Sequence, residues 1–472
     1  MNSVKKNFIY NILYQLLILF LPLITTPYLA RVLGPEKTGI YSYAHSKAYY
    51  FVLFAMLGLN NYGNREIARN RDSLYDRSRT FWSIYSLQIV TSLITLSLYT
   101  IYCAFLRLDD SVSWILLLYV LSACIDINWF FWGLEEFKIT VTKNTIVKLS
   151  SVFAILLFVK SKDDLAVYTL IMVLSNLISQ LLLWPYLKNR IVWYKPSKKE
   201  VLAHLKPNII LFIPIIAISL YKVMDKIMLG ALATYTEVGY YEYSEKIISI
   251  PIACVSALGT VMLPRMSNMV AGNRTAQEFS IICKSIIIGA GLAISMGFGL
   301  MGIAKVFVPL FYGVGYDKCV FLFYILMPSC AFLAVANVLR TQYLIPRRRD
   351  RDYIISVILG ATVNLIINAL LIPYLQSVGA AIGTLAAEAT VCFYQIIILR
   401  KELPVGVYIK ELLSLLLIGT IMLIVVISIP SLGNSVLTIG IKIIIGILVF
   451  GVLFLLKYKE LIIEVLSKKG KN

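Results

Sequence analysis

Histidine, acidic residues and long loops are all scarce in this 472-residue chain. It has only two histidines, and its seven cysteines form no CxxC pair, so neither a metal site nor a disulfide framework is predicted. There is no glycine-rich phosphate loop, and no recognisable catalytic motif pairs a nucleophile with a histidine. We therefore expect a protein that is not an enzyme and has no bound metal or organic cofactor.

Long apolar runs are what the chain has in abundance. Hydrophobic residues make up 59% of it, and its mean hydropathy is +0.81. The runs are about 20 residues long and do not alternate in polarity, which favours membrane-spanning helices over barrel strands. The predicted fold class is therefore an all-α polytopic membrane protein. We predict 14 spans, at 8–33, 38–60, 81–106, 113–134, 144–160, 165–187, 208–231, 239–264, 281–304, 319–342, 353–372, 379–399, 409–430 and 437–456.

The basic residues are distributed unevenly over the connecting loops. With the N-terminus inside, the inner segments hold 31 lysines and arginines and the outer loops hold six. Because such residues collect on the cytoplasmic side, this ratio predicts that both termini are cytoplasmic. The same bias explains the net charge of +19, so we expect membrane lipids and no nucleic acid as partners.

A weak internal repeat occurs at an offset of 200 residues. The stretch 39–44 resembles 239–244, and Arg65 falls on Arg265 at the next helix end. Parallel repeats of this kind occur in transporters, with the substrate path between the halves. The repeat predicts two six-helix lobes, at 1–200 and 201–402, followed by an extra helix pair and a cytoplasmic tail at 403–472.

Charged residues inside the predicted spans are the candidate site. A charge near the bilayer centre costs about 2.5–3.5 kcal/mol, so one that is kept usually faces a cavity or a partner. Surplus cations in a low-dielectric cavity suit an anionic ligand, and diphosphate is a strong candidate. The proposed ligand-binding cations are Arg31, Lys47, Lys222, Lys226 and Lys246. The acidic residues that could balance charge or couple an ion, either a proton or sodium, are Asp126, Asp225, Glu242, Glu245 and Glu388.

Other residues near the span ends are interpreted as interfacial. Lys284 and Lys442 lie within a turn or two of an end and can snorkel to the membrane surface. The aromatic cluster at 129–132 is interpreted as part of an interfacial belt rather than as a sugar-stacking platform.

Several motifs resemble one family of membrane transporters. They are the stretches 26–34 (TPYLARVLG), 39–43 (GIYSY), 61–68 (NYGNREIA), 126–133 (DINWFFWG), 224–226 (MDK) with 229–230 (LG), and 263–265 (LPR). Together they resemble the Wzx-type polysaccharide flippases of the multidrug/oligosaccharidyl-lipid/polysaccharide exporter superfamily. The likeness is specific over the first eight spans and rests on length and topology thereafter.

The resemblance implies a fold, a substrate and a location. It implies two six-helix lobes around a cavity that alternates in access, with a final helix pair that helps to shape a groove for a lipid tail. The implied substrate is an undecaprenyl-diphosphate-linked oligosaccharide repeat unit, moved to the outer leaflet for capsular or exopolysaccharide assembly. The implied location is a bacterial plasma membrane, with a polymerase and other polysaccharide-assembly proteins as candidate partners.

Four alternatives remain open. A flippase for teichoic-acid or peptidoglycan precursors shares the diphosphate handle. A cation-coupled drug exporter is disfavoured by the helix count and by the surplus cations. A membrane polymerase or glycosyltransferase would need a catalytic constellation in a sizeable loop, and no loop exceeds about 20 residues. A structural scaffold is disfavoured by the intramembrane charges.

Overall fold

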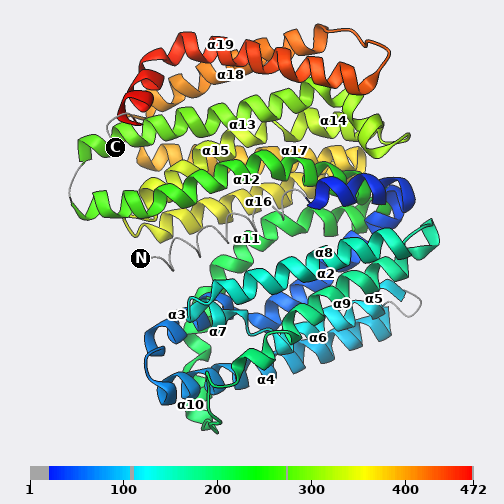
Figure 1. The fold of residues 1–472 in the computed structure, drawn as a ribbon, viewed down its shortest axis with the longest axis vertical. Helices are drawn as coiled ribbons and strands as arrows, with labels where there is room; N and C mark the ends of the chain where they lie inside the picture. Colours follow the sequence, from blue (N-terminus) through cyan, green and yellow to red (C-terminus); the bar gives the residue numbers. More distant parts are fainter. Residues whose placement is uncertain (1–20, 107–110, 273–274, 470–472) are drawn as a thin grey trace. The chain divides into compact units, whose positions relative to one another are not determined.

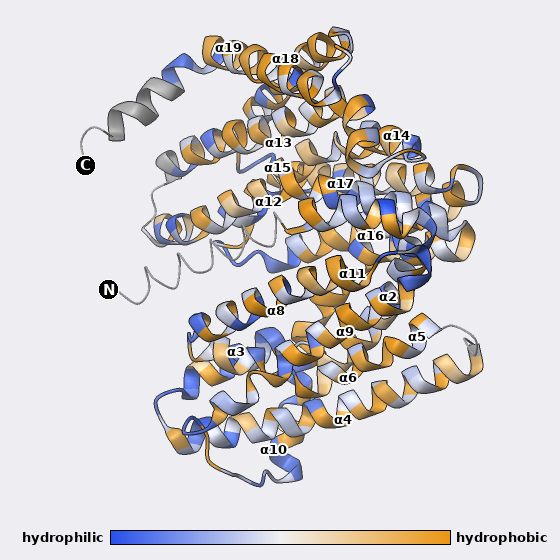
Figure 2. Ribbon diagram, turned by 45° about the vertical axis from the view of Figure 1, so that its right-hand side comes forward, coloured by the Kyte–Doolittle hydropathy of each residue, from blue (hydrophilic) through white to orange (hydrophobic). Residues whose placement is uncertain are grey.

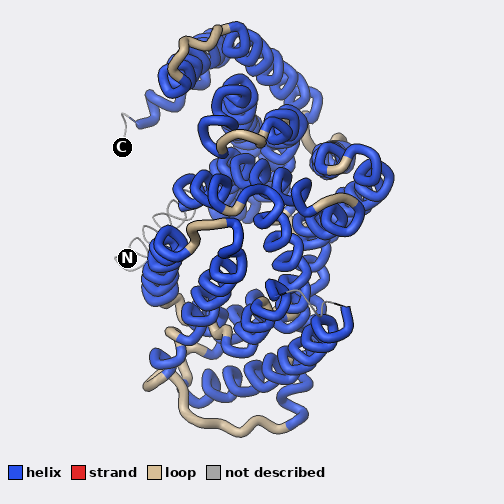
Figure 3. Tube along the Cα trace, turned by 90° about the vertical axis from the view of Figure 1, so that its right-hand side faces the viewer, coloured by secondary structure: helices blue, strands red, loops and turns tan. Residues whose placement is uncertain are grey.

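The computed structural model describes residues 21–106, 111–272 and 275–469, and within these ranges every regular element is a helix (Figure 3). The chain divides into two compact units, which are described separately. The first comprises Met1–Gly230 and Tyr235–Gly239, and the second comprises Ala231–Thr234 and Tyr240–Asn472. The lobe boundaries at residues 200 and 402 stay predictions.

The first unit holds the helices up to α11 (Figure 1). A helical segment at 21–32 precedes them, and two short 3₁₀ turns lie at Lys162–Asp164 and Trp184–Leu187. The helices are α2 (Gly34–Met56), α3 (Leu59–Asn70), α4 (Leu74–Leu106), α5 (Ser111–Ile115), α6 (Leu117–Ile125), α7 (Asn128–Gly133), α8 (Phe137–Phe158), α9 (Leu165–Leu181), α10 (Lys198–Ala203) and α11 (Leu205–Leu232).

The second unit holds most of α12 and the helices after it. A π-helical turn at Arg340–Leu344 follows α15. The helices are α12 (Tyr235–Ala271), α13 (Thr275–Tyr312), α14 (Asp317–Leu326), α15 (Ser329–Leu339), α16 (Asp350–Leu375), α17 (Ser377–Leu399), α18 (Val405–Ser428) and α19 (Ser435–Lys469).

The apolar runs become helices much as predicted. In the part of the chain that the structure describes, twelve helical stretches are long and apolar enough to cross a membrane. They correspond one for one to the third through fourteenth predicted spans. The second predicted span is α2, a helix of 23 residues, and the first lies partly outside the described residues. The all-α membrane class is therefore confirmed, while the count of 14 and the side on which the termini lie stay predictions.

Aromatic packing forms one core of the first unit. Trp129, Phe130 and Phe131 on the short helix α7 are fully buried, and they pack with Phe81 of α4 and Ile67 of α3. The interpretation of this cluster as an interfacial belt is wrong for these three residues. Because α7 is a six-residue helix between two backbone breaks, it turns its aromatic side chains inward instead of following a straight span.

Close helix packing organises the second unit. Helices α16 and α17 form a hairpin in which Gly379 and Gly383 lie directly against α16. Helix α13 packs against α15 on one side and against α18 and α19 on another. In Figure 2 most of α18 and the part of α19 that runs beside it are coloured hydrophobic, as expected of helices that face lipid.

Two glycines of the predicted repeat touch each other within the first unit. A Cβ added to Gly39 would lie 1.7 Å from the Tyr235 carbonyl oxygen, and one added to Gly239 would lie 1.9 Å from the Pro35 carbonyl oxygen. Adding 200 to residue numbers 39 and 35 gives 239 and 235, so the two contacts join the same two repeat positions with the halves exchanged. Helices approach this closely only where no side chain intervenes. This symmetric contact therefore adds structural support to a repeat whose sequence identity alone is weak evidence.

We predict that Gly39→Ala or Gly239→Ala destabilises the protein by about 1–3 kcal/mol, because the new methyl group must displace a backbone carbonyl. Thermal unfolding of the purified protein in detergent measures the effect. Gly440→Ala is the matched control, since nothing lies within 4 Å of a Cβ at that position of α19. Equal midpoints for the three variants would contradict the close crossing.

Candidate functional site

Helices α2 and α11 run antiparallel beside each other in the first unit. The Tyr50 hydroxyl donates a hydrogen bond to the Ser219 carbonyl oxygen at 3.1 Å, and the Phe54 and Phe212 rings are 5.3 Å apart between centroids. The Tyr43 ring packs against Gly230. As the residue number rises along α2, the number of its partner on α11 falls.

This alignment brings together candidate cations from two distant parts of the sequence. Lys47 lies between Tyr43 and Tyr50 on α2, so it is level with the stretch of α11 between Ser219 and Gly230. That stretch carries Lys222, Asp225 and Lys226. Four of the ten predicted site residues therefore lie on the neighbouring stretches of α2 and α11 that these contacts bracket.

Aromatic rings hold the Lys47 ammonium group. Its Nζ atom donates a hydrogen bond to the Tyr102 hydroxyl at 2.8 Å and lies 3.5 Å from the centroid of the Tyr43 ring. A ring face attracts a cation through the negative charge of its π-electrons. These contacts hold the Lys47 ammonium group between α2 and α4.

The three charged residues of α11 differ in exposure. Lys222 is exposed, Lys226 is half-buried, and Asp225 is 2% exposed. Because Lys222 and Asp225 are three residues apart, they share a face of the helix. The arrangement is a buried carboxylate with a lysine on either side, as the sequence predicts.

The other two candidate cations lie on other helical segments. Arg31 is exposed on the segment that precedes the positive-φ Gly34. In the second unit, Lys246 pairs with Glu242 at 3.2 Å along α12, so the predicted i to i+4 ion pair is present. Arg31 and Lys246 stay predictions as ligand-binding residues.

Two predicted acids lie in the second unit near a contact between α12 and α17. The Tyr241 and Thr384 hydroxyls are hydrogen-bonded at 2.8 Å. Glu245 lies one helical turn beyond Tyr241, and Glu388 lies one turn beyond Thr384. Glu388 is 6% exposed and Glu245 is half-buried.

Asp126 lies in a polar network in the first unit. Its Oδ1 atom accepts hydrogen bonds from the backbone and the side chain of Asn128, at 2.9 and 2.6 Å. Asn128 also donates to the side chain of Gln180. Asp126 occupies the backbone break between α6 and α7, where these donors can reach its carboxylate.

A lysine that the sequence assigned to a loop completes this network. The predicted span begins at residue 144, but α8 begins at Phe137, so Lys143 lies within the helix, where it is 6% exposed. Its Nζ atom donates to the Ser179 carbonyl and hydroxyl oxygens at 2.8 and 3.0 Å, and it interacts electrostatically with Asp126. The signal that could have revealed it is the apolar and β-branched run that begins before residue 144.

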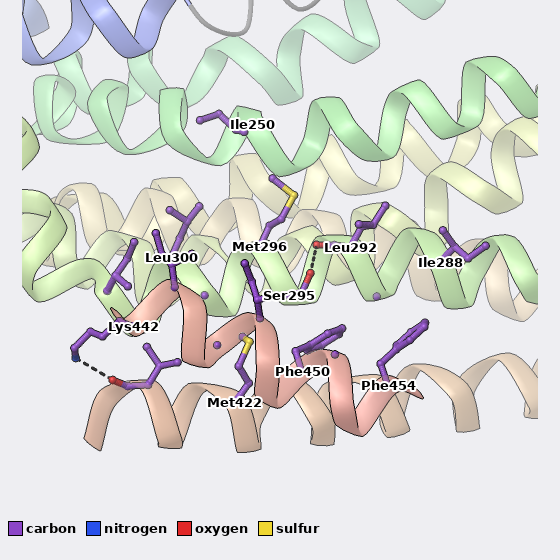
Figure 4. A pocket seen from close by; sticks show the side chains of 18 residues that line it. Ile250, Ile288, Leu292, Ser295, Met296, Leu300, Met422, Lys442, Phe450 and Phe454 are labelled. Atoms are coloured by element: carbon purple, nitrogen blue, oxygen red, sulfur yellow. Dashed lines mark hydrogen bonds between the residues drawn. The ribbon is translucent and has the colours of Figure 1, made fainter. Parts of the chain in front are cut away.

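An apolar groove of about 690 Å³ lies between α13, α18 and α19 in the second unit (Figure 4). Glycines keep it open, because a Cβ added to Gly299 or Gly451 would find nothing within 4 Å. Phe450 and Phe454 line one stretch of it, as Figure 4 shows. Its lining is almost wholly hydrocarbon, which suits an extended apolar chain.

Lys442 is the one charged residue in the groove lining. It is 6% exposed, and its Nζ atom donates to the Val426 carbonyl oxygen in the last turn of α18 at 2.9 Å. The ammonium group is therefore held at a helix end, and the interpretation that it snorkels to the membrane surface stays a prediction. A cation at a helix C-terminus satisfies an otherwise unpaired carbonyl and the helix dipole.

Comparison with known proteins gives the following matches. A family model described as polysaccharide biosynthesis protein matches residues 4–270. A protein of Escherichia coli K12, provisionally named an O-antigen transporter, is 26% identical over 85% of this chain and 97% of its own length. A protein of Shigella dysenteriae with the same name is 23% identical over 83% of this chain and 99% of its own.

Two solved structures share the fold. The inward closed conformation of the lipid II flippase MurJ matches with a TM-score of 0.78 and 16% identity, covering 97% of this chain and 99% of that one. An inward-facing multidrug-resistance transporter of the MATE family and MOP superfamily matches with a TM-score of 0.61 and 12% identity, covering 84% and 99%. At these identities the likeness concerns the fold alone.

We predict that Lys143→Met destabilises the protein by about 1–3 kcal/mol, because it removes the buried donor to Ser179 and the positive charge that acts on Asp126. The double variant Asp126→Asn/Lys143→Met should recover part of the loss. Thermal unfolding in detergent measures both. Additive effects of the two substitutions would show that the residues do not interact.

Proposed function

We propose, from the premise that this chain belongs to the polysaccharide biosynthesis protein family, that it is a flippase for lipid-linked oligosaccharides. The proposed substrate is an undecaprenyl-diphosphate-linked repeat unit, moved from the inner to the outer leaflet by alternating access. The polymer built from these units is proposed to be a surface polysaccharide. The family resemblance implies a capsule or exopolysaccharide, while the names of the relatives favour an O-antigen.

The observation that carries the proposal is the set of charged residues on neighbouring stretches of α2 and α11. Lys47, Lys222, Lys226 and Asp225 lie there, and the formal charges of three lysines and one carboxylate sum to a net positive charge. Ammonium groups make charge-assisted hydrogen bonds to phosphate oxygens, and these bonds are stronger where water is excluded. A diphosphate is the part of the substrate that needs such groups. Arg31 and Lys246 are further proposed contacts.

The apolar groove supports the lipid part of the proposal. A polyprenyl tail is an extended hydrocarbon, and the groove offers it a lining of aliphatic and phenyl side chains on α13, α18 and α19. Two of the helices that form the groove, α18 and α19, belong to the segment that the sequence analysis places outside the repeat.

Glu388 is the proposed residue for ion coupling. Glu242 forms an ion pair with Lys246, and Asp126 accepts hydrogen bonds from Asn128. Glu388 is buried within the apolar helix α17, where gain or loss of a proton or a sodium ion would change the stability of its surroundings most. Glu245 and Asp225 are proposed to balance charge.

We predict that Lys222→Ala/Lys226→Ala abolishes export of the polymer and leaves lipid-linked repeat units on the inner leaflet, while the protein stays in the membrane. Surface polymer and leaflet-resolved lipid-linked sugar measure the outcome. Lys457→Ala/Lys459→Ala, at two exposed positions of α19, is the control and should export normally. Normal export by the α11 variant would refute the binding assignment.

Filling the groove should block transport without unfolding the protein. We predict that Gly299→Phe/Gly451→Phe lowers flipping of a polyprenyl-linked sugar in proteoliposomes at least about tenfold, because the rings occupy the space of the tail. Gly440→Phe places the same ring on α19 at an open position outside the groove and should flip at the normal rate. Equal rates would place the tail elsewhere.

A further inference from the structure

A second cavity, of about 570 Å³, lies in the first unit between the beginning of α4 and the segment 193–202. It shares no lining residue with the apolar groove. Aliphatic side chains make up much of its lining. The others include four aromatic rings and two cations, namely Trp82, Tyr85, Trp193, Tyr194, Lys195 and Lys198.

The wall of this cavity is fixed to α4 by hydrogen bonds. The Trp82 indole N–H donates to the Val192 carbonyl oxygen at 3.0 Å, and the Val192 N–H donates to the Ser78 hydroxyl at 2.9 Å. The Arg77 guanidinium donates to the Arg190 carbonyl oxygen at 2.8 Å. The segment 190–194 is therefore held against the helix, and the cavity is a built feature of the unit.

The charges around the cavity leave two lysines available. The nearby acid Glu200 accepts hydrogen bonds from Arg79 at 2.6 Å and from the Tyr194 hydroxyl at 2.8 Å. Lys195 and Lys198 are exposed and form no ion pair with any residue in the described part of the chain. The 13 lining residues include no acid, so the cavity offers positive charge to a ligand.

Apolar surface continues outward from the same place. Trp193 is 76% exposed, Leu202 is 61% exposed, and Val90 is 53% exposed. Lysines beside exposed tryptophan and aliphatic side chains are the composition of a membrane–water interface on the side with anionic lipid. The charge distribution predicts that the segment 188–207 faces the cytoplasmic leaflet.

We propose that this cavity binds one anionic phospholipid of that leaflet. The lysines contact the lipid phosphate, the tyrosine and tryptophan rings lie at the level of the glycerol backbone, and the acyl chains follow the aliphatic face of α4. The site is independent of the proposed transport function, because it uses none of the residues assigned to the substrate.

The test uses the full-length purified protein in detergent, titrated with phosphatidylglycerol or phosphatidylcholine and examined by native mass spectrometry. The first phosphatidylglycerol should bind about tenfold more tightly than phosphatidylcholine. Lys195→Gln/Lys198→Gln should weaken it by about fivefold per lysine. The matched control is Lys188→Gln/Lys199→Gln, which removes two exposed lysines of the same region that do not line the cavity.

A second readout locates the lipid. Brominated phosphatidylglycerol should quench tryptophan fluorescence, and Trp193→Phe should remove part of that quenching. Equal binding of the two lipids, or an equal loss in the control variant, would overturn the site. Inorganic phosphate at millimolar concentration should not displace the lipid; complete displacement would show a phosphate site without lipid selectivity and would also overturn the proposal. Thermal unfolding confirms that each variant is folded.

Discussion

The high energetic cost of a charge inside a membrane is the constraint on which the rest of this structure depends. Each intramembrane charge whose contacts are described meets that cost in its own way. Lys47 is held by tyrosine rings, Lys143 donates to Ser179 and lies near Asp126, and Lys442 caps a helix end. None of these arrangements is a simple surface ion pair. They show that the apolar helices are built around a small number of polar positions.

These arrangements differ in what they leave available to a ligand. Lys143 and Lys442 donate to backbone carbonyl oxygens, so their charges stabilise helix geometry. Lys47 instead donates to a tyrosine hydroxyl and lies over a tyrosine ring, and Lys222 on the neighbouring α11 is exposed. The kind of contact, rather than the number of cations, therefore distinguishes the proposed binding residues from the two lysines that donate to backbone carbonyls. An anion bound at the proposed site would gain from charges that the first unit already holds in position.

Much of the fold and part of the site could be predicted from the sequence. Apolar runs fix the helices because a bilayer leaves the backbone no alternative that satisfies its hydrogen bonds. The grouping of Lys222, Asp225 and Lys226 follows from helical spacing alone. The level of Lys47 beside them does not, because it depends on how α2 packs on α11. The burial of Trp129 was missed because a backbone break, which hydropathy does not register, turns α7 inward.

The family resemblance implies a groove at the final helix pair, but the residues that line it could not be predicted from the sequence, for a different reason. A groove is a place where side chains are missing, and Gly299 and Gly451 look in a sequence like ordinary small residues of membrane helices. Only the packing of α13 with α18 and α19 shows that the space is left open. Gly39 and Gly239 show the opposite use of the same residue, since there the absent side chain is replaced by another helix. The neighbours of a membrane glycine in space therefore decide whether it allows two helices to pack closely or leaves a groove open. A groove that accepts a lipid tail requires glycines that leave space open.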